Sequence, residues 1–111
     1  MAVGAAYLAT MKTAAGLTAS LYDTQVTDLI EEARAEMVRV GIDATVAANE
    51  SNKLVARAVR THVCANFAES EQEATRLEAS FVSQLSALAL TEAYQATEET
   101  EDDEEAGDDE V

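Results

Sequence analysis

The stretch that decides the fold runs from Lys53 to Leu90 and reads KLVARAVRTHVCANFAESEQEATRLEASFVSQLSALAL. Its large apolar side chains recur at steps of three and four residues, which places them on one side of a helix. The first stripe comprises Leu54, Val55, Ala58, Val59, His62, Val63 and Phe67, and the second comprises Ala74, Leu77, Phe81, Leu85 and Leu88, with Val82 and Ala89 beside it. A break around residues 68–70 separates the stripes. The pattern predicts an αα-hairpin on which the rest of the chain packs.

Two further helices are predicted before this hairpin. Residues 2–15 are rich in alanine and carry Tyr7, Leu8 and Met11 on one side, so we expect a short helix that ends near Gly16. A longer stripe begins at Asp23 and comprises Val26, Leu29, Ile30, Ala33, Met37, Val38 and Val40. Gly41 stands where a helix-terminating glycine belongs, and Ile42 follows it as a hydrophobic clasp.

Polar residues predict where the helices begin and which pairs lie on their exposed sides. Ser20 with Asp23 resembles a capping arrangement, and Ser70 with Glu73 forms a capping box for a helix from about Glu71 to Tyr94. Residues 43–50 read as a loop with one turn around 45–48, and Asn49 or Ser51 is expected to cap the helix that starts near Asn52. The pairs Glu31–Arg34 and Glu36–Arg39 are expected on the exposed side of the second helix.

Composition predicts an all-α fold, a small bundle of three to four helices with an acidic C-terminal tail. Proline is absent and there are only 4 glycines, which favours helices over a turn-rich β fold. One helical domain is expected over residues 1–96, followed by a tail at 97–111. Aromatic residues make up 5% of the chain and tryptophan is absent, so the core of a single subunit is small. We therefore expect either marginal stability of the isolated subunit or stability contributed by its neighbours in an assembly.

The net charge of −15 is unevenly distributed. The tail carries ten acids and no base, whereas residues 1–97 carry 12 acids and 7 bases. Such a balance argues against general binding to nucleic acid, whose phosphates it repels. The charge of the tail suits a basic protein partner better than nucleic acid. Its composition also predicts that it is disordered in isolation.

The chain offers little that resembles a catalytic, cofactor or metal site. Cys64 is the only cysteine and His62 the only histidine, and a spacing of two residues points their side chains apart on a helix. His62 is expected at a helix interface, and Cys64 is expected to be buried or half-buried. No phosphate loop, nucleophile elbow or metal motif is present in the sequence. We therefore predict that the protein is not an enzyme, holds no cofactor or metal and has no membrane span or signal peptide.

Two basic groups stand out in this acidic chain. Lys53, Arg57 and Arg60 follow one another at steps of four and three residues and so share one side of their helix, while Arg34 and Arg39 lie on the preceding helix. One interpretation is that all of them form salt bridges on the surface of their own subunit. The other is that the face of Lys53, Arg57 and Arg60 meets the acidic surface of an identical neighbour in a ring.

The order of these features resembles the head-to-tail connector proteins, also called adaptor or head-completion proteins, of tailed bacteriophages or related archaeal tailed viruses. The resemblance covers about Met11 to Leu90. It rests on the spacing of Val26, Leu29, Ile30, Ala33, Arg34 and Met37, the Gly41-Ile42 ending, the linker with Asn49 and Ser51, the helix from Leu54 to Phe67, and Phe81, Gln84 and Leu85 in the last helix. The chain departs from that family at residues 65–70, where relatives often carry an aromatic-Asn pair and a Gly-Ser turn.

The resemblance implies a structural role in the virion, at the interface of head and tail, for a protein made in the host cytoplasm. Members of that family form rings, commonly dodecameric, between the portal protein and the tail or its stopper, and DNA passes through without specific binding. An acidic wall suits such a passage because it repels DNA. The expected contacts with neighbouring subunits or the portal involve Lys53, Arg57, Arg60, Arg34 and Arg39 and the tail residues Glu101, Asp102, Asp103, Glu104 and Glu105.

Other hypotheses account for the same composition. The chain also fits a small acidic helical binding protein or DNA mimic that occupies a basic partner surface, and a helical accessory subunit of an enzyme such as a terminase. In addition, 22 acids with only two lysines resemble proteins from high-salt cytoplasm, which a virus of a halophilic host would share.

Overall fold

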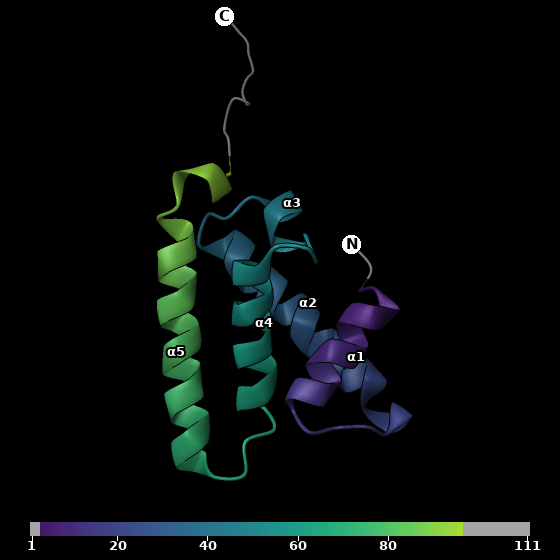
Figure 1. The fold of residues 1–111 in the computed structure, drawn as a ribbon. Helices are drawn as coiled ribbons and strands as arrows, with labels where there is room; N and C mark the ends of the chain where they lie inside the picture. The colour runs from purple at the N-terminus through teal and green to yellow at the C-terminus, as the bar shows by residue number, and fades with distance from the viewer. Residues whose placement is uncertain (1–2, 97–111) are drawn as a thin grey trace, which may run out of the picture.

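The computed structural model describes residues 3–96, which form a bundle of five α-helices with two short 3₁₀ turns (Figure 1). The elements in order are α1 (Ala5–Ala14), η1 (Ser20–Tyr22), α2 (Asp23–Arg39), α3 (Ala44–Ala47), α4 (Lys53–Ala65), α5 (Glu71–Ala89) and η2 (Glu92–Tyr94). The all-α prediction is therefore confirmed. The tail at 97–111, for which we predicted disorder in isolation, lies outside the described residues.

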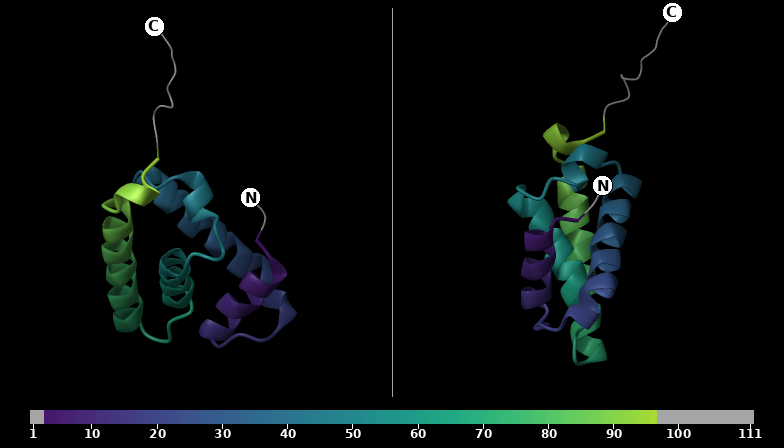
Figure 2. Two further views of the ribbon diagram at one scale, coloured as in Figure 1. Left: turned by 45° about the horizontal axis from the view of Figure 1, so that its top comes forward. Right: turned by 90° about the vertical axis from the view of Figure 1, so that its right-hand side faces the viewer.

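Helix α4 lies at the centre of the bundle. It runs antiparallel to α5, to which residues 66–70 join it, and its other sides contact α2 and α1. Figure 2 shows α4 between α5 on one side and the pair of α1 and α2 on the other. The predicted αα-hairpin is thus present, and α4 is the helix through which α5 connects to the rest of the fold.

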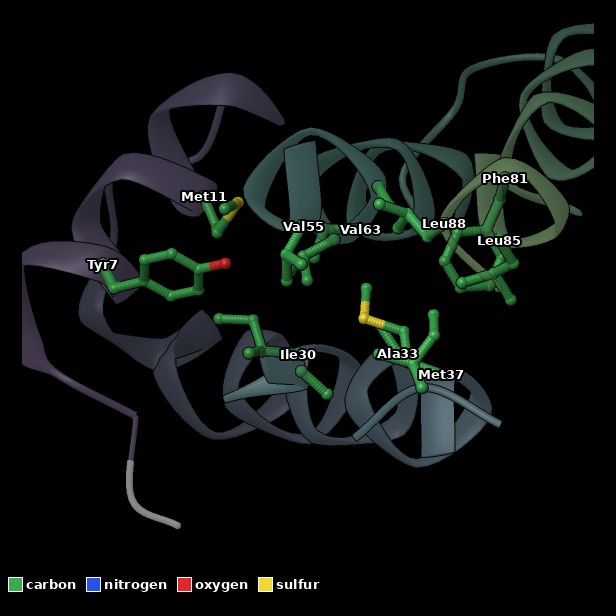
Figure 3. Packing of buried hydrophobic residues seen from close by; sticks show 14 of the residues in the cluster. Tyr7, Met11, Ile30, Ala33, Met37, Val55, Val63, Phe81, Leu85 and Leu88 are labelled. Carbon is green, nitrogen blue, oxygen red and sulfur yellow. The ribbon is translucent and has the colours of Figure 1, made fainter. Parts of the chain in front are cut away.

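The core is a set of apolar side chains that all four long helices contribute. Tyr7 and Met11 of α1 and Ile30 and Met37 of α2 point toward α4 (Figure 3). The buried apolar residues on α4 and α5 are Val55, Ala58, Val59, Val63, Phe81, Leu85 and Leu88. Full burial of one such large side chain contributes roughly 1.5–3 kcal/mol, so this continuous cluster is the main source of stability.

Side-chain caps begin three of the helices in residues 3–96. At the start of α3, Asp43 Oδ1 accepts a hydrogen bond from Thr45 N at 2.8 Å. Asn52 Oδ1 accepts hydrogen bonds from the backbone N–H groups of Leu54 and Val55, at 3.0 and 3.1 Å, so Asn52 caps α4 rather than Asn49 or Ser51. Ser70 Oγ accepts a hydrogen bond from Glu73 N at 3.1 Å, as predicted for α5. The predicted cap by Ser20 is wrong, because Ser20 begins η1 and no side chain caps α2.

Glycine ends α2 as predicted. Gly41 has a φ of +104°, which an L-residue with a Cβ rarely adopts. Its conformation turns the chain so that Ile42 N donates a hydrogen bond to Met37 O at 3.0 Å, and Ile42 is almost fully buried. This is the hydrophobic clasp that the sequence predicted.

Helix α5 ends at Ala89 and not at Tyr94 as predicted. The chain beyond it pairs with the turn after α2: Asp43 N donates to Tyr94 O at 2.8 Å, and Ala96 N donates to Gly41 O at 2.9 Å. Gln95 Nε2 also donates to the carbonyl of Ala89 at 3.1 Å, which satisfies one acceptor at the helix end. These contacts with a distant part of the chain replace the last helical turns.

Three apolar residues predicted in or beside the stripes lie largely on the surface. The exposed fractions are 53% for Leu54, 47% for Val38 and 60% for Val82. Each directly precedes or follows a buried or nearly buried position, and one residue along a helix is a rotation of 100°. The buried stripe of each helix is therefore narrower than the apolar pattern suggests.

Candidate functional site

The most distinctive surface feature is the outward side of α4, where Lys53, Arg57 and Arg60 are all exposed. We call these three residues the α4 basic face. Helix α4 contains no Asp or Glu. Within residues 3–96, none of the three has an ion pair with a carboxylate. The interpretation in which these bases are neutralised by surface salt bridges thus finds no partner among the described residues.

The other four bases of the chain each have a carboxylate beside them. The pairs are Lys12 with Asp23 at 2.5 Å, Arg34 with Glu50 at 3.1 Å, Arg39 with Glu36 at 2.8 Å and Arg76 with Glu73 at 4.0 Å. Positive charge without a partner in residues 3–96 is therefore concentrated on one side of one helix.

Arg34 differs from its prediction, because it is buried rather than on the exposed side of α2. Its guanidinium contacts Glu50, whose carboxylate also accepts a hydrogen bond from Gly4 N at 2.8 Å. The guanidinium carbon lies 5.6 Å from the centre of the Tyr7 ring, within reach of a cation–π contact. Arg34 thus holds the start of α1 against α2 and is not available to a partner.

Arg39 is exposed and pairs with Glu36, as the spacing predicted. The hydrogen bond from Arg39 lowers the pKa of Glu36, and the same bond raises the pKa of Arg39. A pair this exposed contributes little to stability. Arg39 lies on α2, so it does not belong to the α4 basic face.

The α4 basic face runs between α5 and α1. On the α5 side, a shallow groove of about 130 Å³ is lined by Leu54, Arg57, Gln84, Ala87, Leu88 and Thr91. On the α1 side, burial raises the pKa values of Tyr7 and Cys64, and the positive charge of Arg60 is near enough to oppose part of this effect on both. The face therefore combines three cations with a small apolar depression.

A second surface, on α2, has the opposite charge. Asp28, Glu31 and Glu32 are exposed there at steps that share one side of the helix, and we call them the α2 acidic face. Next to it, α2 and α3 enclose an open groove of about 390 Å³, whose apolar walls include Val38 and Ala44. Helix α2 packs against α4 mainly through its opposite, buried side. Glu32 lies at the edge of that contact, since its Oε1 is 2.6 Å from Nε2 of His62, and Asp28 and Glu31 form the part of the face that has no such contact with α4.

His62 lies on the buried side of α4 and is 7% exposed. Its Nε2 is 2.6 Å from Glu32 Oε1, its Nδ1 is 3.4 Å from Glu78 Oε2, and its ring centre is 4.6 Å from that of Phe81. The helix-interface position was predicted, but the two carboxylates were not, because no sequence spacing connects residues on three different helices. The carboxylates flank different nitrogens of the ring, an arrangement that orients the imidazole.

No arrangement for nucleophilic or metal chemistry is found in residues 3–96. Cys64 is half-buried, its Sγ lies 3.4 Å from Ala14 O, and burial raises the pKa of its thiol, which lowers the fraction of reactive thiolate. Within the same residues, no three acidic, His or Cys side chains are grouped as metal ligands. The predicted contact residues Glu101, Asp102, Asp103, Glu104 and Glu105 lie outside the described residues.

None of the helices in the described part of the chain combines the length and apolar character that a membrane crossing requires. Comparison of the chain with protein families, with curated proteins and with solved structures finds no match.

Proposed function

We propose that the chain is a structural subunit that associates head to tail with identical copies and forms the head-to-tail connector ring of a tailed virus. The observation that carries this proposal is the α4 basic face, three exposed cations without a carboxylate partner in residues 3–96 of an acidic chain. The complementary surface is the α2 acidic face on a second copy.

The charge pattern favours a head-to-tail contact over a twofold one. In a twofold dimer built on the α4 basic face, Lys53, Arg57 and Arg60 would meet the same three cations of the partner, and like charges would repel. Contact between the basic face of one copy and the acidic face of the next joins unlike surfaces. Repetition of such a contact produces a ring when the rotation closes.

The resemblance to connector proteins specifies what such a ring does. It would occupy the position between portal and tail, and DNA would pass through its centre. The body carries five more acids than bases, so a wall built of these subunits repels DNA rather than binding it. The acidic tail supplies charge for a basic surface on the portal.

Charge exchange between the two faces tests the contact. We expect the variant R57E/R60E and the variant D28K/E31K each to associate less than the natural chain in sedimentation velocity at low salt. The combined variant R57E/R60E/D28K/E31K restores attraction with the charges exchanged, so its association should recover. R76E is the matched control, because Arg76 is exposed on α5 outside both faces, and it should leave association unchanged. Failure of the combined variant to recover would show that these two faces are not partners.

Electron microscopy of the protein with its candidate portal, at low and at molar salt, tests the ring itself. A ring stacked coaxially on the portal supports the connector role. A folded monomer that neither self-associates nor binds the portal at either salt would overturn it and favour the alternative, an acidic binding protein or DNA mimic.

A further inference from the structure

We infer that the acidic segment at residues 97–111 docks on the α4 basic face of its own chain in the free subunit. The docked tail covers the surface that ring formation uses, so it keeps free subunits apart. The docking follows from charge and position alone, whereas its effect on assembly rests on the proposed function.

The first argument is charge complementarity. The tail contains ten acids and no base, and α4 contains three exposed bases and no acid. Lys53, Arg57 and Arg60 have no carboxylate partner in residues 3–96, and every acid beyond that range belongs to the tail. The first turn of α4 has no acidic residue, and the partial positive charge of a helix N-terminus adds to the attraction there.

The second argument is where the tail begins. Because α4 and α5 are antiparallel, the end of α5 lies beside the start of α4, and Thr91 and Leu54 line the same groove. Hydrogen bonds of Asp43 N to Tyr94 O and of Ala96 N to Gly41 O then hold the last described residues in place. Figure 1 shows this end of the chain at the same end of the bundle as the beginning of α4.

The third argument is reach. Residues 97–111 span at most about 50 Å when fully extended. Helix α4 has 13 residues and is about 20 Å long. The tail is therefore long enough to run along the whole basic face from its starting point. A tethered segment of this length acts at an effective concentration on the order of millimolar, which compensates for the weakness of exposed ion pairs.

The consequence is a competition for one surface. The α4 basic face of a free subunit binds either its own tail or the α2 acidic face of another copy. A strongly basic partner surface that attracts the tail would free α4 and so promote association at the place where that partner lies. Assembly would then be coupled to docking on the partner.

Amide spectra of isotope-labelled protein at low salt test the docking. Three chains are compared: the full chain, a chain that ends at Ala96, and the full-length variant E101Q/D102N/D103N/E104Q/E105Q. We expect the signals of Lys53, Arg57 and Arg60 to differ between the full and shortened chains, and the neutralised variant to resemble the shortened chain. Molar salt should remove the difference. Identical α4 signals in all three chains at low salt would overturn the inference.

Two controls define the contact. R57Q/R60Q should abolish the effect of the tail on α4, whereas R76Q, which neutralises an exposed arginine on α5, should preserve it. A labelled chain that ends at Ala96 should show the same α4 signals whether it is mixed with unlabelled full chain or with an equal concentration of unlabelled chain that also ends at Ala96. A difference between the two mixtures would assign the contact to the tail of another copy and overturn docking within one chain.

Sedimentation velocity separates the docking from its role in assembly. The neutralised variant should associate at a concentration roughly fivefold lower than the full chain. Equal association of both would overturn the regulatory role. If neither chain associates in any condition while the spectra show the contact, the proposed ring function fails and the docking stands.

Discussion

Glu32 Oε1 lies 2.6 Å from Nε2 of His62, and this contact joins α2 to α4 across 30 residues of sequence. The same imidazole stacks on Phe81 of α5, with ring centres 4.6 Å apart. Three helices therefore meet at one side chain. Since α5 packs mainly on α4, the contacts of His62 provide a link between α2 and α5.

Replacement of His62 should destabilise the fold. We expect H62A to lower the free energy of unfolding by roughly 2–4 kcal/mol, because it leaves a cavity beside Phe81 and removes the hydrogen bond to Glu32. E32Q replaces the carboxylate with an amide of nearly the same shape, whose oxygen can still accept the hydrogen bond. It should lower the free energy of unfolding by about 1 kcal/mol or less. Urea denaturation followed by circular dichroism measures both values. A loss below about 1 kcal/mol for H62A would show that the three-helix contact is not important for stability.

Substitution of Gly41, in the turn after α2, tests a contribution to stability that comes from backbone conformation alone. Gly41 has a φ of +104°, and a Cβ at this position would meet no heavy atom within 4 Å. G41A should therefore cost about 1–2 kcal/mol through strain without a steric clash. G41N should cost less, since asparagine tolerates positive φ better. Equal stability of G41A and the natural chain in thermal unfolding would contradict the assigned turn.

Glu50 should hold the beginning of α1 in place. Its carboxylate accepts hydrogen bonds from Gly4 N and from Arg34, at 2.8 and 3.1 Å. E50A removes both, and we expect a loss of roughly 1–3 kcal/mol together with faster amide hydrogen exchange in α1. E31A is the matched control, because Glu31 is an exposed acid on α2, and it should leave exchange in α1 unchanged. Slow exchange in α1 of E50A would show that apolar packing of Tyr7 and Met11 suffices.

Much of this fold follows from local rules that one sequence reveals. The stripes at three- and four-residue steps predicted α2, α4 and α5, and the glycine after Val40 predicted the end of α2 with Ile42 buried behind it. These features depend on periodicity and on the conformational freedom of glycine. Both act over a few residues, so they are visible without knowledge of the fold.

The errors arose where distant parts of the chain decide the outcome. Helix α5 ends at Ala89 because residues 94–96 form backbone hydrogen bonds with the turn at residues 41–43. No local sequence pattern predicts this contact. Arg34 was expected to face solvent beside Glu31, but its guanidinium is buried in contact with Glu50 and the Tyr7 ring.

For the candidate site, the spacing in the sequence placed Lys53, Arg57 and Arg60 on one side of α4. Only the structure shows that the other four bases of the chain have carboxylate partners.

Cys64 offers a test that depends on pH. Burial raises the pKa of its thiol, and the nearby Arg60 partly opposes this effect. The folded chain therefore releases the thiol proton at higher pH than the unfolded chain, and the associated stability is lost as pH rises through the folded-state pKa. We expect alkylation by iodoacetamide, followed by mass spectrometry between about pH 7 and 10, to reach its half-maximal rate at higher pH in the folded chain than in urea. R60Q removes the opposing charge and should move that midpoint still higher. Coincident midpoints for folded and unfolded chains would show that the thiol is not protected by its burial against α1.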